Sequence, residues 1–209
     1  MDSDQGFIDL VKGTFALYLQ HGSRSSLRTD FMHNGLKGMI ESVLPEDSGY
    51  TVKLEKLITS CNSSGTKRCD IVLYKADIPF IVFPVKHIMT NYYQNKNNGW
   101  ENMTGECCQL KWCNPNLHIS PINIIFNQVP YLLSGGLIKH YEGITHDKSY
   151  SIYDKLTDHN ITTDMINYIV DVEPISDIGS RYDTCPTVIG FNVDTPFRAF
   201  QEIIRPLIQ

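Results

Sequence analysis

Two charged residues lie in neighbouring apolar segments of the chain. Asp70 stands near the start of the segment 69–74 (CDIVLY), and Lys86 stands near the end of the segment 80–88 (FIVFPVKHI). Apolar segments of this length are typical of buried strands, which place few charges at such positions by chance. A carboxylate can bind Mg²⁺, and a lysine can stabilise the charge that develops on a phosphate. The pair therefore favours metal-assisted phosphodiester hydrolysis, and the alternative is a surface ion pair at a strand end.

These two residues can act together only if the segments that carry them pair. Residues 75–79 form a short connection between the segments, which predicts a β-hairpin. Alternating or continuous apolar residues predict four strands in one mixed sheet: 50–58, 69–74, 80–88 and 121–126. Apolar residues at helical spacing predict three helices, the last on a face of that sheet: 6–20, 29–43 and 100–112. The remaining segments predict short helices at 148–157 and 163–171, a strand at 186–193, and a last helix capped by Thr195.

The composition is that of a folded chain with a hydrophobic core. The 209 residues are 42% hydrophobic, which excludes a disordered chain and suits one domain. The net charge is −5, from 18 Lys and Arg against 23 Asp and Glu. This balance argues against a general nucleic-acid coat, but it leaves room for an enzyme with a local basic cleft.

The cysteines and the start of the chain bear on location and cofactors. The six cysteines include no C-x2-C pair, so a zinc site is disfavoured. The first residues lack the pattern of a signal peptide, and no segment is apolar enough to cross a bilayer. We therefore expect a cytoplasmic protein with reduced cysteines and no membrane contact. The absence of phosphate-binding glycine motifs predicts no nucleotide cofactor.

With these elements in this order, residues 31–131 resemble the PD-(D/E)xK nuclease superfamily, the fold of type II restriction endonucleases. The likeness is carried by KRCDIVLY (67–74), FIVFPVKH (80–87), the helix with Asn102 and Glu106, and the strand 121–126. The resemblance implies an α/β fold with a restriction-endonuclease-like core, a central mixed sheet flanked by helices. It implies a single nuclease-like domain over 1–209, with its core at about 29–131, an N-terminal helix and a C-terminal mixed extension.

The function implied by this resemblance is Mg²⁺-dependent cleavage of double-stranded DNA by a homodimeric endodeoxyribonuclease. One alternative is a catalytically inactive relative that binds DNA without cutting it. Another is a nuclease of DNA repair or recombination.

The chain departs from the family motif at Pro84, which stands where the second acid is expected, two residues before Lys86. Proline has no carboxylate and no N–H, so we expect a bulge or a break in the strand. Three interpretations remain open: the chain is inactive, the Val85 carbonyl still binds the metal, or another carboxylate replaces the missing one. Some family members supply that acid from the following helix, which implicates Glu101 first and Glu106 second.

The resemblance thus assigns catalytic roles to Asp70, Lys86 and Glu101, with Asp70, Val85 and Glu101 as metal ligands. Glu41 could assist a second metal, and Gln109 could support the lysine or a phosphate. The plain alternative for these helix residues is a solvated surface position. We expect the Asn-rich segment 91–99 to be a loop, and its amides could contact DNA bases. Together with several cationic side chains, they are the candidates for DNA contacts: Arg24, Arg28, Lys67, Arg68, Asn95, Lys96, Asn97 and Asn98.

Overall fold

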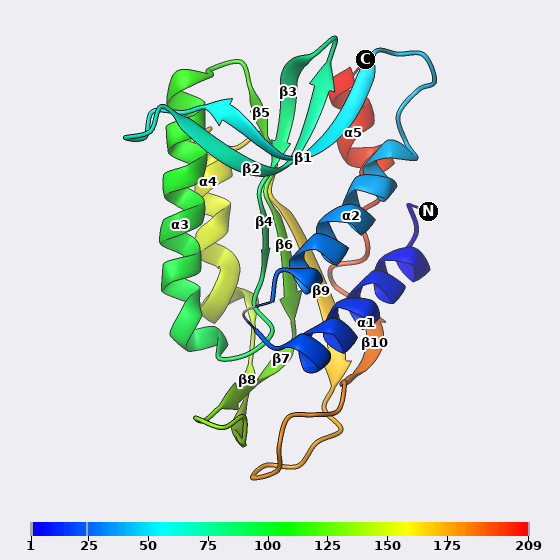
Figure 1. The fold of residues 1–209 in the computed structure, drawn as a ribbon, viewed down its shortest axis with the longest axis vertical. Helices are drawn as coiled ribbons and strands as arrows, with labels where there is room; N and C mark the ends of the chain where they lie inside the picture. Colours follow the sequence, from blue (N-terminus) through cyan, green and yellow to red (C-terminus); the bar gives the residue numbers. More distant parts are fainter. Residues whose placement is uncertain (1, 24, 209) are drawn as a thin grey trace.

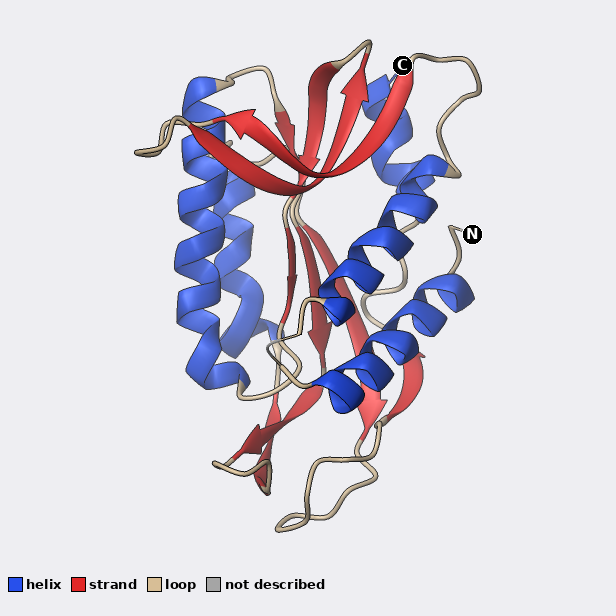
Figure 2. Ribbon diagram, viewed as in Figure 1, coloured by secondary structure: helices blue, strands red, loops and turns tan. Residues whose placement is uncertain are grey.

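The protein has an α/β architecture in which helices flank mixed β-sheets (Figures 1 and 2). The computed structural model describes residues 2–23 and 25–208. The first sheet contains four strands in this order: β1 (Tyr50–Thr59), β2 (Thr66–Lys75), β3 (Ile78–Phe83) and β5 (His118–Ile119). The second sheet also contains four: β10 (Thr187–Phe191), β9 (Ile166–Glu173), β6 (Ile122–Phe126) and β4 (Val85–His87).

The predicted hairpin is confirmed. Strands β2 and β3 pair antiparallel, with Ile71 opposite Phe83 and Leu73 opposite Ile81. Strand β3 then runs parallel to β5, and β4 runs parallel to β6. A further hairpin that the sequence pattern did not predict joins β7 (Gln128–Leu132) to β8 (Ile138–Gly143).

The prediction of one sheet is wrong, because the central strand breaks at Pro84. The segment 80–88 contributes β3 to the first sheet and β4 to the second. The neighbouring strand breaks at the same level, at Ser120 and Pro121, and Ile122 N still donates a hydrogen bond to Pro84 O. The expected break at Pro84 is therefore confirmed, and its consequence is that β4 forms an edge of the second sheet.

The helices lie on both sides of this sheet break (Figure 1). On one side are α1 (Asp4–His21) and α2 (Leu27–Glu41), and on the other is α3 (Tyr92–Cys113). Helix α3 begins eight residues before its predicted start, so most of the Asn-rich segment expected to be a loop is helical. The buried carboxylate of Glu142 explains this start, because it accepts a hydrogen bond from Tyr92 N at 2.5 Å.

The C-terminal part differs in two places from the sequence-based prediction. Residues 163–171 were expected to be helical, but they contain most of β9. This strand lies between β6 and β10, and its Tyr168 side chain is buried in the hydrophobic core. Helix α5 (Phe200–Ile208) begins later than Thr195 predicted. The strand at 186–193 is confirmed as β10, and residues 146–158 form three consecutive helical turns: η1 (His146–Tyr150), η2 (Ser151–Tyr153) and α4 (Asp154–Asp158).

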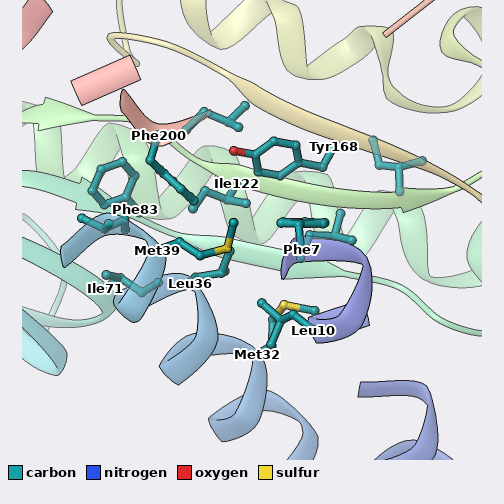
Figure 3. Close-up of a cluster of buried hydrophobic side chains, with 14 of the residues drawn as sticks. Phe7, Leu10, Met32, Leu36, Met39, Ile71, Phe83, Ile122, Tyr168 and Phe200 are labelled. Atoms are coloured by element: carbon teal, nitrogen blue, oxygen red, sulfur yellow. The ribbon is translucent and has the colours of Figure 1, made fainter. Parts of the chain in front are cut away.

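The core fills the space between α1, α2 and the two sheets (Figure 3). Met32, Leu36 and Met39 project from α2 toward the strands, where they meet fully buried side chains such as Ile71 and Phe83. Burial of this one face fixes how α2 lies on the strands, and so where its polar residues point.

The expectation of reduced cysteines is wrong for one pair. Cys61, two residues after the end of β1, forms a disulfide with Cys113, the last residue of α3, across 52 residues of sequence. A cytoplasmic location implied that all cysteines are reduced, because disulfides are rare in cytosolic proteins. The Cys61–Cys113 bond disagrees with that expectation. In residues 2–23 and 25–208, none of the helices combines the length and apolar composition that crossing a bilayer requires.

Candidate active site

Three residues from three elements converge where the central strand breaks. His33 of α2, Glu55 of β1 and Asp70 of β2 each offer a ligand atom, and these atoms lie within 4.8 Å of one another. His33 Nδ1 lies 3.4 Å from Glu55 Oε1. Glu55 stands opposite Asp70 in the antiparallel register, since Leu54 pairs with Ile71 and Lys56 with Cys69. The set of one imidazole and two carboxylates can hold a divalent cation.

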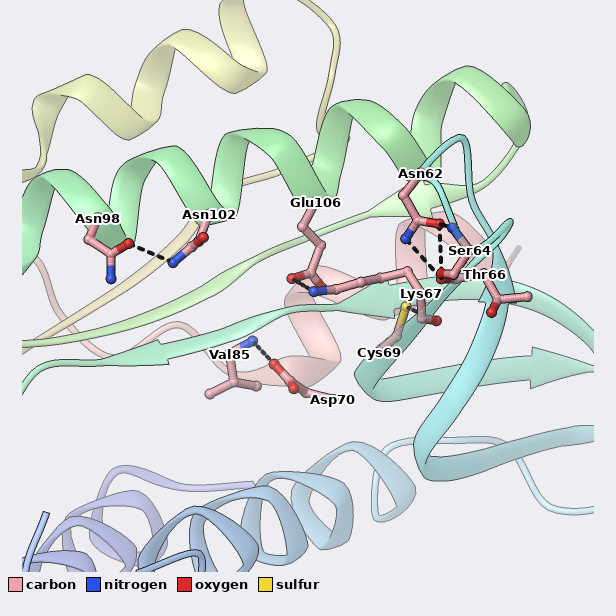
Figure 4. Close-up of polar contacts among 10 residues, drawn as sticks. All are labelled: Asn62, Ser64, Thr66, Lys67, Cys69, Asp70, Val85, Asn98, Asn102 and Glu106. Atoms are coloured by element: carbon pink, nitrogen blue, oxygen red, sulfur yellow. Dashed lines mark hydrogen bonds and ion pairs between the residues drawn. The ribbon is translucent and has the colours of Figure 1, made fainter. Parts of the chain in front are cut away.

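Asp70 is positioned by the backbone that follows Pro84. Its Oδ2 accepts a hydrogen bond from Val85 N at 2.7 Å, and Oδ1 has no hydrogen-bond donor among the described residues (Figure 4). Consecutive Cα atoms are about 3.8 Å apart, so the Asp70 carboxylate lies within about 8 Å of the Lys86 Cα. The break in the strand thus places the Asp70 carboxylate near the backbone of Lys86.

Glu55 has an unusual backbone conformation for a residue inside a strand. Its φ angle is 52°, in the left-handed region that residues with a Cβ rarely adopt. Such a conformation costs on the order of 1–3 kcal/mol and persists only where the surrounding structure imposes it. Strained residues of this kind concentrate at binding and catalytic sites, which agrees with the place of Glu55 beside Asp70 and His33.

A second polar group lies on the α3 side of the strands. Lys67 Nζ contacts Glu106 Oε2 of α3 at 3.0 Å (Figure 4). Lys67 is three residues before Asp70 on β2, so its side chain points to the opposite face of the sheet. Burial raises the pKa of Glu106, and Asp70 raises it further, while Lys67 and Lys86 lower it. The Glu106 carboxylate of α3 therefore lies close enough to interact electrostatically with both predicted catalytic residues, Asp70 and Lys86.

Lys86 lies against α3 at Gly99. A Cβ on Gly99 would stand 3.3 Å from Lys86 Cε, so the glycine leaves room for the lysine stem. Among the described residues, none forms an ion pair with Lys86. Its ammonium group is thus available to an anion.

Strand alternation predicts that His87, the residue after Lys86, faces away from the lysine side chain. Burial lowers the pKa of His87 to about 3, and the nearby charges of Arg28, His33 and Lys86 lower it further. The imidazole is therefore neutral at physiological pH.

Two of the predicted carboxylates lie elsewhere. Glu101 is exposed, and it lies five residues before Glu106, which places it about 140° away around the helix. Glu41 is exposed and pairs with Lys37 at 3.3 Å, two turns beyond His33 on α2. The described contacts bring neither acid to Asp70.

The remaining predicted residues divide between the site and the surface. Gln109 is half-buried, and its backbone oxygen accepts a hydrogen bond from Cys61 N. Arg68 is exposed on β2, and Lys96 donates to Lys148 O beside the exposed Asn97. Arg24 lies outside the described residues. Three of the predicted DNA-contact residues, Arg28, Asn95 and Asn98, line a cavity together with Lys86.

Sequence reasoning missed His33 and Glu55. His33 is buried on the apolar face of α2, beside Met32 and Leu36, and a polar residue on such a face is a signal in the sequence. Glu55 could have been found from the β1–β2 register, but that register depends on where the turn lies.

Comparisons with known proteins add no relative. No protein-family model matches the chain, and no curated protein sequence matches it significantly. The functional assignment therefore depends on the site geometry and on the motif resemblance.

Proposed function

We propose that this protein is a metal-dependent endodeoxyribonuclease with a restriction-endonuclease-like core. The observation that carries the proposal is the cluster of His33, Glu55 and Asp70, in which Asp70 accepts a hydrogen bond from Val85 N, one residue before Lys86, at the break between β3 and β4. The order of elements supports it: a helix, three antiparallel strands, a helix, and a strand parallel to the third. This is the order that the resemblance to the PD-(D/E)xK superfamily implies.

The donor set fits a divalent cation. Two carboxylates suit Mg²⁺, and the imidazole of His33 makes Mn²⁺ an equally good candidate. A cation held there would neutralise phosphate charge and lower the pKa of a bound water. The Val85 carbonyl, one residue before Lys86, is a further ligand candidate. Since three side chains already converge, the proposed metal site does not require an acid at position 84.

The rival function is DNA binding without cleavage. It is favoured by Pro84, which carries no carboxylate, and by the Lys67–Glu106 ion pair, which already engages the Glu106 carboxylate of α3. A nuclease of repair or recombination would share the site and differ in its substrate.

Plasmid cleavage tests the proposal. Supercoiled plasmid is incubated with the protein and Mg²⁺, Mn²⁺, Ca²⁺ or EDTA, and nicked and linear products are measured. We expect cleavage with Mg²⁺ or Mn²⁺ only, and its loss in Asp70→Asn. The matched control is Asp77→Asn, whose carboxylate is exposed on the β2–β3 turn. Cleavage by Asp70→Asn at the rate of the unchanged chain would refute the site.

Metal binding separates an inactive relative from an active nuclease. We expect Mn²⁺ to raise the melting temperature, and His33→Asn to weaken that shift, because it removes the nitrogen ligand. His159→Asn, at an exposed histidine, is the control. Metal binding without cleavage of any DNA would favour the non-cutting alternative, whereas neither binding nor cleavage would leave His33 as a plain partner of Glu55.

A further inference from the structure

A polar cavity of about 420 Å³ opens beside Lys86. It lies along β4, at the edge of the second sheet, and residues of α1, α2 and the first turns of α3 form its walls. Its lining includes Arg28, Lys86 and His87, and no acidic side chain is found among the described residues that line it. A cavity with two cations and no acid is unusual in a chain of net charge −5, and it predicts an anionic ligand.

Arg28 is held in place without a carboxylate partner. Its guanidinium lies over the Tyr18 ring at 5.5 Å and donates to Ser23 O at 3.1 Å and Met89 Sδ at 3.4 Å. Its Nε is shielded from solvent and has no hydrogen-bond partner in the described part of the chain. Each terminal guanidinium nitrogen carries a second N–H besides the one used on Met89 or Ser23. A preorganised arginine with no carboxylate partner among the described residues is suited to bind a phosphate through these donors.

The opposite wall offers both hydrogen-bond donors and acceptors. Asn95 Nδ2 donates a hydrogen bond to Asn91 O, and Asn98 Oδ1 accepts a hydrogen bond from Asn102 Nδ2. The Asn95 oxygen and the Asn98 nitrogen therefore remain available at the cavity wall. An amide oxygen and an amide nitrogen are the acceptor and donor types that recognise nucleobase edges.

We propose that this cavity binds one unpaired nucleotide of the substrate strand, with a phosphate between Arg28 and Lys86 and the base against Asn95 and Asn98. The choice of a nucleotide, rather than another phosphate ester, rests on the proposed nuclease function. The volume is in the range of pockets that hold one small molecule, about 300–1,000 Å³, and a paired base inside a duplex cannot enter such a pocket. The substrate is thus a single strand, a strand end or an extruded nucleotide.

Ligand binding in EDTA tests the cavity without any metal chemistry. Deoxyadenosine 5′-monophosphate, inorganic phosphate and deoxyadenosine are titrated by calorimetry. We expect the nucleotide to bind at least tenfold more tightly than either part alone. We expect Arg28→Met to weaken nucleotide binding at least tenfold and Arg28→Lys to recover part of it. Arg181→Met, at an exposed arginine, should bind as the unchanged chain does.

Equal binding of phosphate and nucleotide, or no binding of the nucleotide, would overturn the proposal. Unchanged binding by a folded Arg28→Met protein would also overturn it.

Cleavage of matched oligonucleotides tests the substrate class. A single strand and a blunt duplex of the same sequence are compared in Mn²⁺, and we expect the single strand to be cut at least tenfold faster. Equal or faster cutting within the duplex would refute the unpaired nucleotide while supporting the nuclease function. Tight nucleotide binding with no cutting of either substrate would support the cavity and refute the nuclease function.

Discussion

At the scale of single residues, Pro84 changes the shape of the site as well as its charge. It removes the acid that the family motif places two residues before the lysine. It also ends the strand ladder, and the next N–H, that of Val85, donates to Asp70 instead. The same residue that removes one proposed metal ligand therefore helps to orient another, Asp70.

The substitution Pro84→Glu tests which effect matters. Pro84 is buried, and a carboxylate there without a partner costs several kcal/mol. Because His33, Glu55 and Asp70 already converge, we expect lower thermal stability and no faster plasmid cleavage. Cleavage that appears only in the Pro84→Glu protein would instead show that the unchanged chain is inactive.

Lys86→Ala should abolish cleavage and leave folding nearly intact, while DNA binding loses one proposed phosphate contact. A half-buried lysine without an ion-pair partner among the described residues contributes little to stability, whereas a charge that acts on the transition state is worth about 10²–10³ in rate. Plasmid cleavage, DNA retardation and thermal melting are compared with those of Lys139→Ala, at an exposed lysine. Undiminished cutting by Lys86→Ala would place the chemistry elsewhere.

At the scale of elements, α3 is fixed at both ends. Glu142 accepts a hydrogen bond from its first residue, and the disulfide of Cys113 ties its last residue to the end of β1. Between these ends, α3 positions Glu106, Gly99 and the amides of the cavity. Two predictions concern these attachments.

Loss of the disulfide in a Cys61→Ser, Cys113→Ser double variant should destabilise the fold. Closing a loop across 52 residues is worth about 4 kcal/mol in the chain-entropy model, and we expect a loss of that order in chemical denaturation. Cys185→Ser, at a half-buried free cysteine, is the control. A midpoint shift no larger than that of the control would show that the bond adds no stability.

Glu142→Gln should lower the free energy of unfolding by about 1–2 kcal/mol. The variant keeps an acceptor for Tyr92 N but loses the negative charge at a helix N-terminus. Denaturant titration measures the change, with Glu173→Gln at an exposed strand position as the control. Equal stability of the two variants would contradict a capping role.

At the scale of the whole molecule, the open question is how many copies act together. Two-fold symmetry matches a palindromic duplex, so the resemblance to restriction endonucleases predicts a homodimer. Light scattering after size exclusion should then give twice the chain mass. A monomer at micromolar concentration would contradict the dimer and would agree with a site that takes one strand at a time.

Much of the framework follows from local sequence patterns. The period of apolar residues identifies strands β1, β2, β3 and β6, because burial of one face or of both faces leaves its own repeat. The break at Pro84 follows from the missing N–H of proline. The short connection predicts the hairpin of β2 and β3, whereas the register that brings Asp70 to the start of β4 comes from the structure.

Only the tertiary structure decided the rest, because it depends on contacts between residues far apart in sequence. His33 lies near Asp70 because the apolar face of α2 packs on the strands. Glu55 joins them because its backbone is in the left-handed region, which no sequence pattern predicts. The partner of Cys61 and the capping of α3 by Glu142 depend on neighbours about 50 residues away. Local patterns encode which residues are buried and in what repeat, whereas the site is set by which buried faces meet.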